Sequence, residues 1–140
     1  MKKIFLLFTI LILISGCSEN NARSNNPFLP DYAFSISIDT NLPLYSSLQF
    51  AGNVMIIDQP NAGIRGIILY NSGSGYLAYD AACPNQFLAS CSTLKLTGIE
   101  ITCPCDDAKY SIFNGTSPGL QYPLKQYRTE VNGKIIKIFN

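Results

Sequence analysis

The sequence predicts an all-β domain, and three observations support this class. Short apolar runs alternate with polar residues at period two, as in half-buried strands. The eight prolines and ten glycines interrupt the chain at strand-length intervals. Beyond the N-terminal apolar segment, no stretch shows a sustained helical period. We therefore expect strands and turns through most of the chain.

The first half of the domain contains four predicted strands. Residues 33–39 alternate apolar and polar side chains, and Val54 to Ile57 form a short apolar strand. Residues 66–70 and 76–80 flank a loop, Asn71 to Gly75, that is rich in turn-forming residues. Two glycines in this loop can adopt positive φ, so the flanking strands should form a hairpin.

The second half of the domain also contains predicted strands. Residues 96–102 form one strand-like run between two cysteine-containing loops. Residues 127–131 and 134–139 are joined by Asn132-Gly133, which is the strongest short hairpin signal in a sequence. We therefore expect the chain to end in a hairpin.

The N-terminus has the features of an export signal. Met1-Lys2-Lys3 is basic, and residues 4–14 are apolar except for one threonine, which is too short a run to span a bilayer comfortably. The run ends in Ile14-Ser15-Gly16-Cys17, which resembles the lipobox of bacterial lipoproteins. The resemblance implies that Cys17 is lipidated and that the lipid bilayer is a partner. The alternative is an ordinary signal peptide in which Cys17 is incidental.

Three regions follow from these features: a lipoprotein signal peptide (1–16), the lipidated Cys17 with a flexible Asn- and Ser-rich tether (17–31), and one domain (32–140). Removal of Lys2 and Lys3 changes 10 basic and 9 acidic residues to 8 and 9, a net charge of −1. A near-neutral chain without a basic cluster argues against nucleic acid as a partner. We expect a lipid-anchored protein of the bacterial cell envelope that faces an extracytoplasmic compartment. The sequence identifies neither the membrane nor a protein partner.

Four cysteines remain in the domain: Cys83, Cys91, Cys103 and Cys105. Two Cys-Pro loops could bring ligands together for a metal or a cluster, but the chain contains no histidine. An all-cysteine site for zinc or [2Fe–2S] would use all four. Two disulfides are the third possibility, and an oxidising compartment favours them.

The two Cys-Pro loops and the residues around them resemble the Rieske [2Fe–2S] domain family. The resemblance extends over roughly residues 66–139, and the chain is similar to small Rieske-like lipoproteins of bacteria. It implies a Rieske-like antiparallel β-sandwich or barrel with a two-loop cysteine subdomain. The residues that carry the resemblance are Tyr79-Asp80-Ala81-Ala82-Cys83-Pro84, Cys103-Pro104-Cys105, Lys109-Tyr110-Ser111, Gly115, Pro123-Leu124 and Tyr127.

The chain departs from the Rieske pattern at both histidine positions. Cys83 and Cys103 match the two thiolate ligands, whereas Asn85 and Asp106 stand where the histidines belong. An amide is a poor iron ligand, and a carboxylate would not tune the cluster as imidazole does. In a surviving metal site, Cys83, Cys103 and Asp106 would be the ligands.

The same resemblance suggests how the cysteines pair. Rieske domains of respiratory complexes commonly link their two cluster loops by a disulfide, and Cys91 and Cys105 resemble that pair. Cys83 and Cys103 would then face each other across an emptied site and close into a second disulfide if their Cα atoms come within about 7 Å.

The predicted function is that of a membrane-anchored lipoprotein with a degenerate Rieske-like domain. We expect an accessory or binding module that is stabilised by disulfides, without catalytic residues and without a cofactor. The alternative is a [2Fe–2S] redox protein that transfers electrons.

Two further groups of side chains could serve in packing or in binding. The tyrosines could line a ligand groove, but strand tyrosines more often pack in a core, and we favour packing. The acidic residues near the cysteine loops are expected to be solvated loop tips. The tyrosines are Tyr70, Tyr76, Tyr79, Tyr110, Tyr122 and Tyr127, and the acidic residues are Asp80, Asp106 and Asp107.

Overall fold

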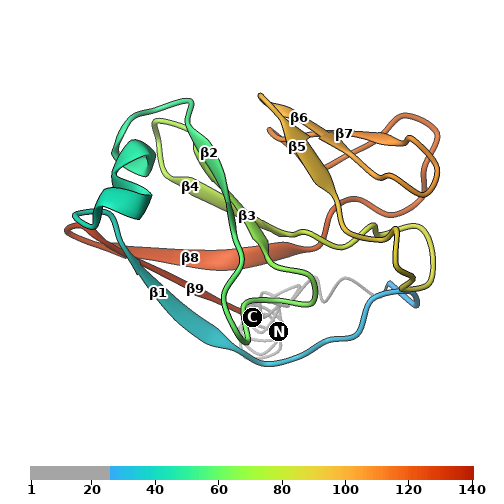
Figure 1. Ribbon diagram of the computed structural model, residues 1–140, viewed down its shortest axis with the longest axis horizontal. Helices are drawn as coiled ribbons and strands as arrows, with labels where there is room; N and C mark the ends of the chain where they lie inside the picture. Colours follow the sequence, from blue (N-terminus) through green and yellow to red (C-terminus); the bar gives the residue numbers. More distant parts are fainter. Residues whose placement is uncertain (1–25) are drawn as a thin grey trace, which may run out of the picture.

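The computed structural model describes residues 26–140, and the predicted all-β antiparallel fold is confirmed there. Within these residues, six strands form one sheet in the order β1-β9-β8-β4-β3-β2, and three form a smaller sheet in the order β5-β6-β7 (Figure 1). The elements are β1 (Ser35–Asp39), η2 (Pro43–Gln49), β2 (Val54–Ile57), β3 (Ile67–Asn71), β4 (Tyr76–Asp80), β5 (Lys95–Thr97), β6 (Glu100–Thr102), β7 (Lys109–Ser111), β8 (Gln126–Asn132) and β9 (Ile135–Phe139).

Both predicted hairpins are present. In the β3–β4 hairpin Asn71 pairs with Tyr76, and Gly73 takes a φ of 87° in the loop. In the β8–β9 hairpin Asn132 pairs with Ile135, so the turn lies one residue later than predicted. Gly133, with a φ of 61°, occupies the first position of the two-residue loop, where glycine readily adopts positive φ.

The large sheet curls around its own core. All six of its strands contribute to one buried cluster, and this is possible only if its edge strands β1 and β2 bend toward the same interior. Tyr45 and Leu48 of the 3-10 helix η2 complete the cluster. The strand residues of the cluster are Ile38, Ile57, Ile67, Leu69, Ala78, Tyr127, Ile136 and Ile138.

The small sheet packs against the outer face of this curl. β3 is buried along its whole length, because Ile67 and Leu69 point into the first cluster while Ile68 and Tyr70 join a second. The second cluster contains Ile101 of β6 and the cysteines Cys83 and Cys103. The first cysteine of each loop is therefore buried in the core between the two sheets.

The run 96–102 is two strands and not one. Leu96 of β5 pairs with Ile101 of β6, and the chain turns between them at Gly98, which has a φ of 63°. The apolar residues on both sides of the turn concealed it, because Gly98 was the only break in the pattern.

Residues 26–31, which the composition places in the flexible tether, lie against the domain in the structure. Leu29 is buried, and Asp31 forms an ion pair of 2.8 Å with the buried Lys125. Single side chains, invisible in an Asn- and Ser-rich composition, fix this segment.

The predicted signal peptide and Cys17 lie outside the described residues. Within residues 26–140, no helix has the length and apolar character needed to cross a membrane.

Candidate functional site at the cysteine loops

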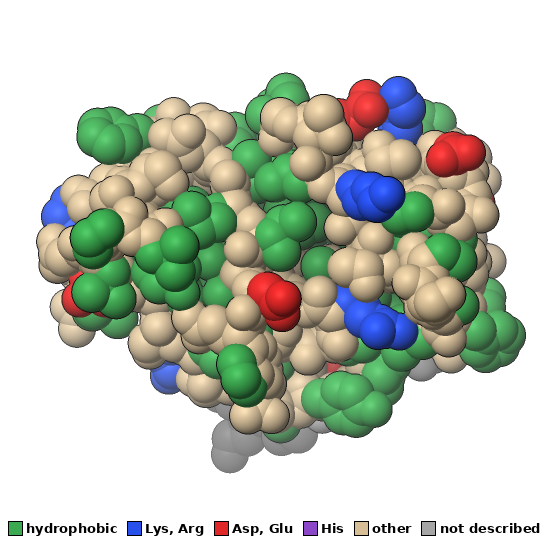
Figure 2. All heavy atoms as spheres, in the orientation of Figure 1, with side chains coloured by type: hydrophobic (Ala, Val, Ile, Leu, Met, Phe, Trp, Pro, Cys, Tyr) green, Lys and Arg blue, Asp and Glu red, His purple; other side chains and the backbone are tan. Residues whose placement is uncertain are grey.

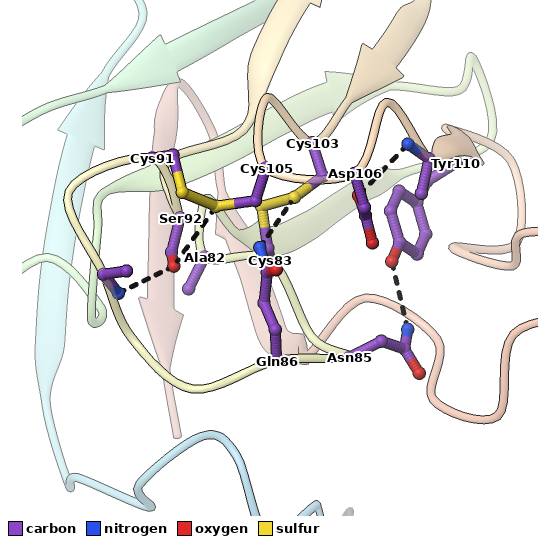
Figure 3. The surroundings of a disulfide bond; sticks show 12 residues. Ala82, Cys83, Asn85, Gln86, Cys91, Ser92, Cys103, Cys105, Asp106 and Tyr110 are labelled. Carbon is purple, nitrogen blue, oxygen red and sulfur yellow. Dashed lines mark hydrogen bonds between the residues drawn. A yellow bond between two sulfur atoms is a disulfide. The ribbon is translucent and has the colours of Figure 1, made fainter.

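Two short loops form the centre of the site (Figure 3). The first cysteine loop (residues 83–92) follows β4, and the Cys83 N–H donates to the carbonyl of Ser92 at 2.9 Å to close it. The second cysteine loop (residues 103–108) joins β6 to β7 and is closed by the Cys103 N–H, which donates to the Ala108 carbonyl at 2.9 Å. Strands of both sheets thus hold the loops side by side.

Two disulfides in the described chain join these loops to each other. Cys83 is bonded to Cys103 and Cys91 to Cys105, with Cα separations of 5.7 and 5.2 Å. Both separations lie in the normal range for disulfides. Cys83 and Cys103 are almost fully buried, whereas Cys91 is exposed. The two sulfurs that match the thiolate ligands are therefore bonded to each other.

Asn85 links the first cysteine loop to the segment that precedes β8. Its Nδ2 donates to the Tyr122 carbonyl at 2.7 Å and to the Tyr110 hydroxyl at 3.0 Å. Its Oδ1 accepts the Tyr122 N–H at 2.9 Å. Because both ends of the amide are engaged, Asn85 acts as a clamp between three segments of the chain.

Asp106 has a local and exposed role. Its Oδ1 accepts the Ala108 N–H at 3.1 Å within the second cysteine loop. The next residue, Asp107, takes a φ of 57°, a left-handed conformation that aspartate tolerates better than most residues. Asp106 and Asp107 are both exposed, in agreement with the prediction that they lie at solvated loop tips.

Tyr110 lies close to both substituted histidine positions (Figure 3). Burial raises the pKa of its phenol, the hydrogen bond from Asn85 opposes the rise, and the negative charge of Asp106 adds to it. Tyr110 is therefore neutral at physiological pH and serves Asn85 as a hydrogen-bond acceptor.

The residues at this site do not fit a Rieske cluster. The amide of Asn85 is committed to Tyr122 and Tyr110, and the chain contains no histidine to replace it. Asp106 is the one carboxylate at a histidine position, and it accepts a hydrogen bond within its own loop at the surface. Across residues 26–140, no group of three His, Cys, Asp or Glu side chains is arranged to hold a metal ion.

Asp80 corrects the expectation of solvated acidic residues. It is fully buried at the end of β4, and its carboxylate accepts the N–H groups of Ile64, Arg65 and Ala82 and the Tyr127 hydroxyl, the last at 2.6 Å. Burial raises the pKa of Asp80, while these hydrogen bonds oppose the rise. Through Ala82, the carboxylate also fixes the start of the first cysteine loop.

The predicted packing role of the tyrosines agrees with the structure. Tyr70, Tyr79, Tyr110 and Tyr127 are buried in the two core clusters. Tyr76 is partly buried and donates from its hydroxyl to the Leu48 carbonyl at 2.9 Å.

Two side chains at the site were not identified from the sequence. Gln86 donates from Nε2 to the Cys103 sulfur at 3.0 Å. Ser92 is fully buried, and its hydroxyl accepts the Ala89 N–H at 2.8 Å and donates to the Phe87 carbonyl at 3.2 Å. Neither residue type stands out in a polar loop, so no sequence signal identified them.

Comparison with known families finds a match at the N-terminus of the chain. Residues 1–18 match the prokaryotic membrane lipoprotein lipid attachment site. The chain carries a lipoprotein lipid attachment site. The predicted attachment of the protein to the bilayer through lipid is supported by this match.

Comparison with solved structures gives distant likenesses. The chain is similar to a structure of the reduced oxygenase and oxidised ferredoxin of carbazole 1,9a-dioxygenase (17% identity, TM-score 0.47, 76% of this chain and 92% of that one). It is also similar to the ferredoxin of carbazole 1,9a-dioxygenase from Nocardioides aromaticivorans IC177 (16% identity, TM-score 0.44, 77% of this chain and 97% of that one). A third similar structure is that of a protein assigned as the small subunit of an NADH-dependent nitrite reductase from Mycobacterium tuberculosis (13% identity, TM-score 0.45, 79% of this chain and 97% of that one). Likeness at this level transfers no function, and no curated protein matches the chain significantly.

Proposed function

We propose that this protein is an extracytoplasmic lipoprotein whose Rieske-like domain works as an accessory or binding module without a redox cluster. The observation that carries the proposal is the Cys83–Cys103 disulfide. A Rieske centre needs two free thiolates to hold its first iron. The same two sulfurs cannot form a disulfide and bind iron.

The clamp at Asn85 supports the same conclusion for the second iron. At this position the chain has a side chain whose hydrogen bonds stabilise the loops, in place of one that donates electrons to a metal. The disulfides support an extracytoplasmic location, because such bonds persist in oxidising compartments.

The test is to search for a cluster under conditions that favour one. The full chain is produced in a host competent for cluster assembly, purified without oxygen, and analysed for visible absorption, iron, acid-labile sulfide and an electron paramagnetic resonance signal after reduction. We expect a colourless protein whose cysteines 83, 91, 103 and 105 react with a thiol reagent only after reduction.

A Cys83→Ser variant serves as the matched control. About two irons and two sulfides per chain, the content of a [2Fe–2S] centre, with a signal that is lost in Cys83→Ser, would overturn the proposal and establish the electron-transfer alternative. A small iron content that is unchanged in Cys83→Ser indicates adventitious metal and leaves the proposal standing.

A further inference from the structure

The N-terminal segment of the described chain packs on the first cysteine loop. Asn26 is buried, and its Nδ2 donates to the Pro84 carbonyl at 2.7 Å, directly after Cys83. Phe28 packs edge-to-face on Phe87, with ring centroids 5.1 Å apart, and on Tyr122, at 5.8 Å. In Figure 1 this blue segment runs beside the yellow loop. The chain therefore enters the domain at its cysteine-loop end.

The distance from this entry point to the lipid anchor is short. Cys17 precedes Asn26 by nine residues, and an extended chain spans at most about 3.3–3.6 Å per residue, or about 30 Å in total. A domain of this size is roughly 35 Å across, from a radius of gyration of about 13 Å. Since this reach is a little less than the width of the domain, the anchor allows the cysteine-loop end to touch the bilayer more readily than the opposite end.

The first cysteine loop has an exposed apolar tip and contains no charged residue of its own. Phe87 at the tip of the first cysteine loop is 75% exposed, and Leu88 beside it is 39% exposed. No residue from Pro84 to Ser92 carries a charge. Figure 2 shows hydrophobic side chains at the right-hand edge, where Figure 1 places this loop. Phe and Leu are among the side chains that segments lying on a bilayer bury in its interface.

We propose that Phe87 and Leu88 form a membrane-contact surface, which seats the cysteine-loop end of the domain on the bilayer that holds Cys17. This rests on the lipid attachment of the proposed function. Two apolar side chains bind a bilayer weakly by themselves, but the lipid tether makes the contact intramolecular and raises its effective concentration. The charges near the loop have both signs, because Arg65 donates to the Ala89 carbonyl at 3.1 Å while Asp106 and Asp107 are exposed on the second cysteine loop. We therefore expect the apolar side chains, and not net charge, to drive the contact.

The chain contains no tryptophan, so a single introduced tryptophan reports its own surroundings. Lipidated full-length Phe87→Trp protein is reconstituted into phosphatidylcholine vesicles with and without brominated phosphatidylcholine. The control is Phe50→Trp, because Phe50 is similarly exposed at 68% but follows η2 at the left of Figure 1, far from the cysteine loops. We expect a blue-shifted, bromine-quenched emission for Phe87→Trp at low and high salt, and no quenching for Phe50→Trp.

The outcomes separate the proposal from the anchoring on which it rests. Protein that does not sediment with vesicles shows that the anchor has failed. Protein that sediments while Phe87→Trp remains unquenched overturns the membrane contact and leaves the anchor intact. Equal quenching of both tryptophans also overturns it, as does an unquenched Phe87→Trp whose loop crosslinks to a second copy. Leu88→Trp repeats the test if Phe87→Trp changes the far-ultraviolet circular dichroism of the domain.

Discussion

Replacement of Asn85 by alanine tests directly whether this residue holds the loops together. The change removes three hydrogen bonds, two to the Tyr122 backbone and one to the Tyr110 hydroxyl. At roughly 1 kcal/mol of net stability each, the expected loss is about 2–3 kcal/mol. With an unfolding entropy of about 2.1 cal/mol/K per residue, this corresponds to a melting temperature about 10 °C lower.

Asp106→Ala is the matched control, because Asp106 occupies the other histidine position. It removes one local, exposed hydrogen bond to Ala108, so the expected loss is below about 1 kcal/mol. Asn85→Asp should lie between wild type and Asn85→Ala, because a carboxylate can still accept the Tyr122 N–H but cannot donate to the Tyr122 carbonyl. Urea unfolding followed by circular dichroism provides the free energies.

The reasoning fails if Asn85→Ala and Asp106→Ala unfold at the same urea concentration. It also fails if Asn85→Ala keeps wild-type stability while the iron content of protein from a cluster-competent host falls. In that case Asn85 would be acting on a metal site and not on the loops.

Three further changes test other parts of the structure. Cys91→Ser removes a disulfide across a sequence separation of 14 and should cost roughly 3 kcal/mol in the chain-entropy description, with non-reducing peptide maps of wild type checking the pairing. Tyr127→Phe removes the hydroxyl that donates to Asp80 and should cost about 1.5–3 kcal/mol at neutral pH. The Tyr127 hydroxyl favours the charged form of Asp80, so the loss should shrink as acid protonates the carboxyl. Because burial raises the folded-state pKa of Asp80, this should begin at a higher pH than for an exposed aspartate, which urea titrations at several pH values would show. Gly63→Ala should destabilise more than Gly52→Ala in thermal melts. Both glycines have positive φ, at 67° and 87°, but a Cβ at Gly63 would lie 2.5 Å from the Asp80 carboxylate, whereas one at Gly52 meets nothing within 4 Å.

Most of the fold could be predicted from local pattern. Alternating residues identified β1, and turn residues identified the β3–β4 and β8–β9 hairpins, because these signals depend on neighbours in the sequence. The turn at Gly98 was missed, since apolar residues on both sides made residues 96–102 resemble one strand.

The roles of single polar residues could not be predicted in this way. Asp80 is buried because donors from three separate places in the chain, residues 64 and 65, residue 82 and residue 127, converge on it in space. Likewise, Asn85 depends on Tyr122, which is 37 residues away. Sequence comparison with a Rieske pattern marked Asn85 as a departure, but it showed only what the residue cannot do for a metal. The role of Asn85 in holding the loops together could be recognised only from the folded structure, in which Tyr122 lies beside it.

Under the proposed function, the changes at this site reinforce one another. Without imidazole at positions 85 and 106, the second iron has no nitrogen ligands, and two thiols remain buried together. In an oxidising compartment such thiols close into Cys83–Cys103, whose Cα atoms are 5.7 Å apart. Asn85 then fixes the segment before β8 against the closed loops. A return to cluster binding would therefore need three changes together: new iron ligands, reduction of the Cys83–Cys103 disulfide, and loss of the Asn85 hydrogen bonds. Each change alone lowers the stability of the fold, and a bound metal could compensate only after all three.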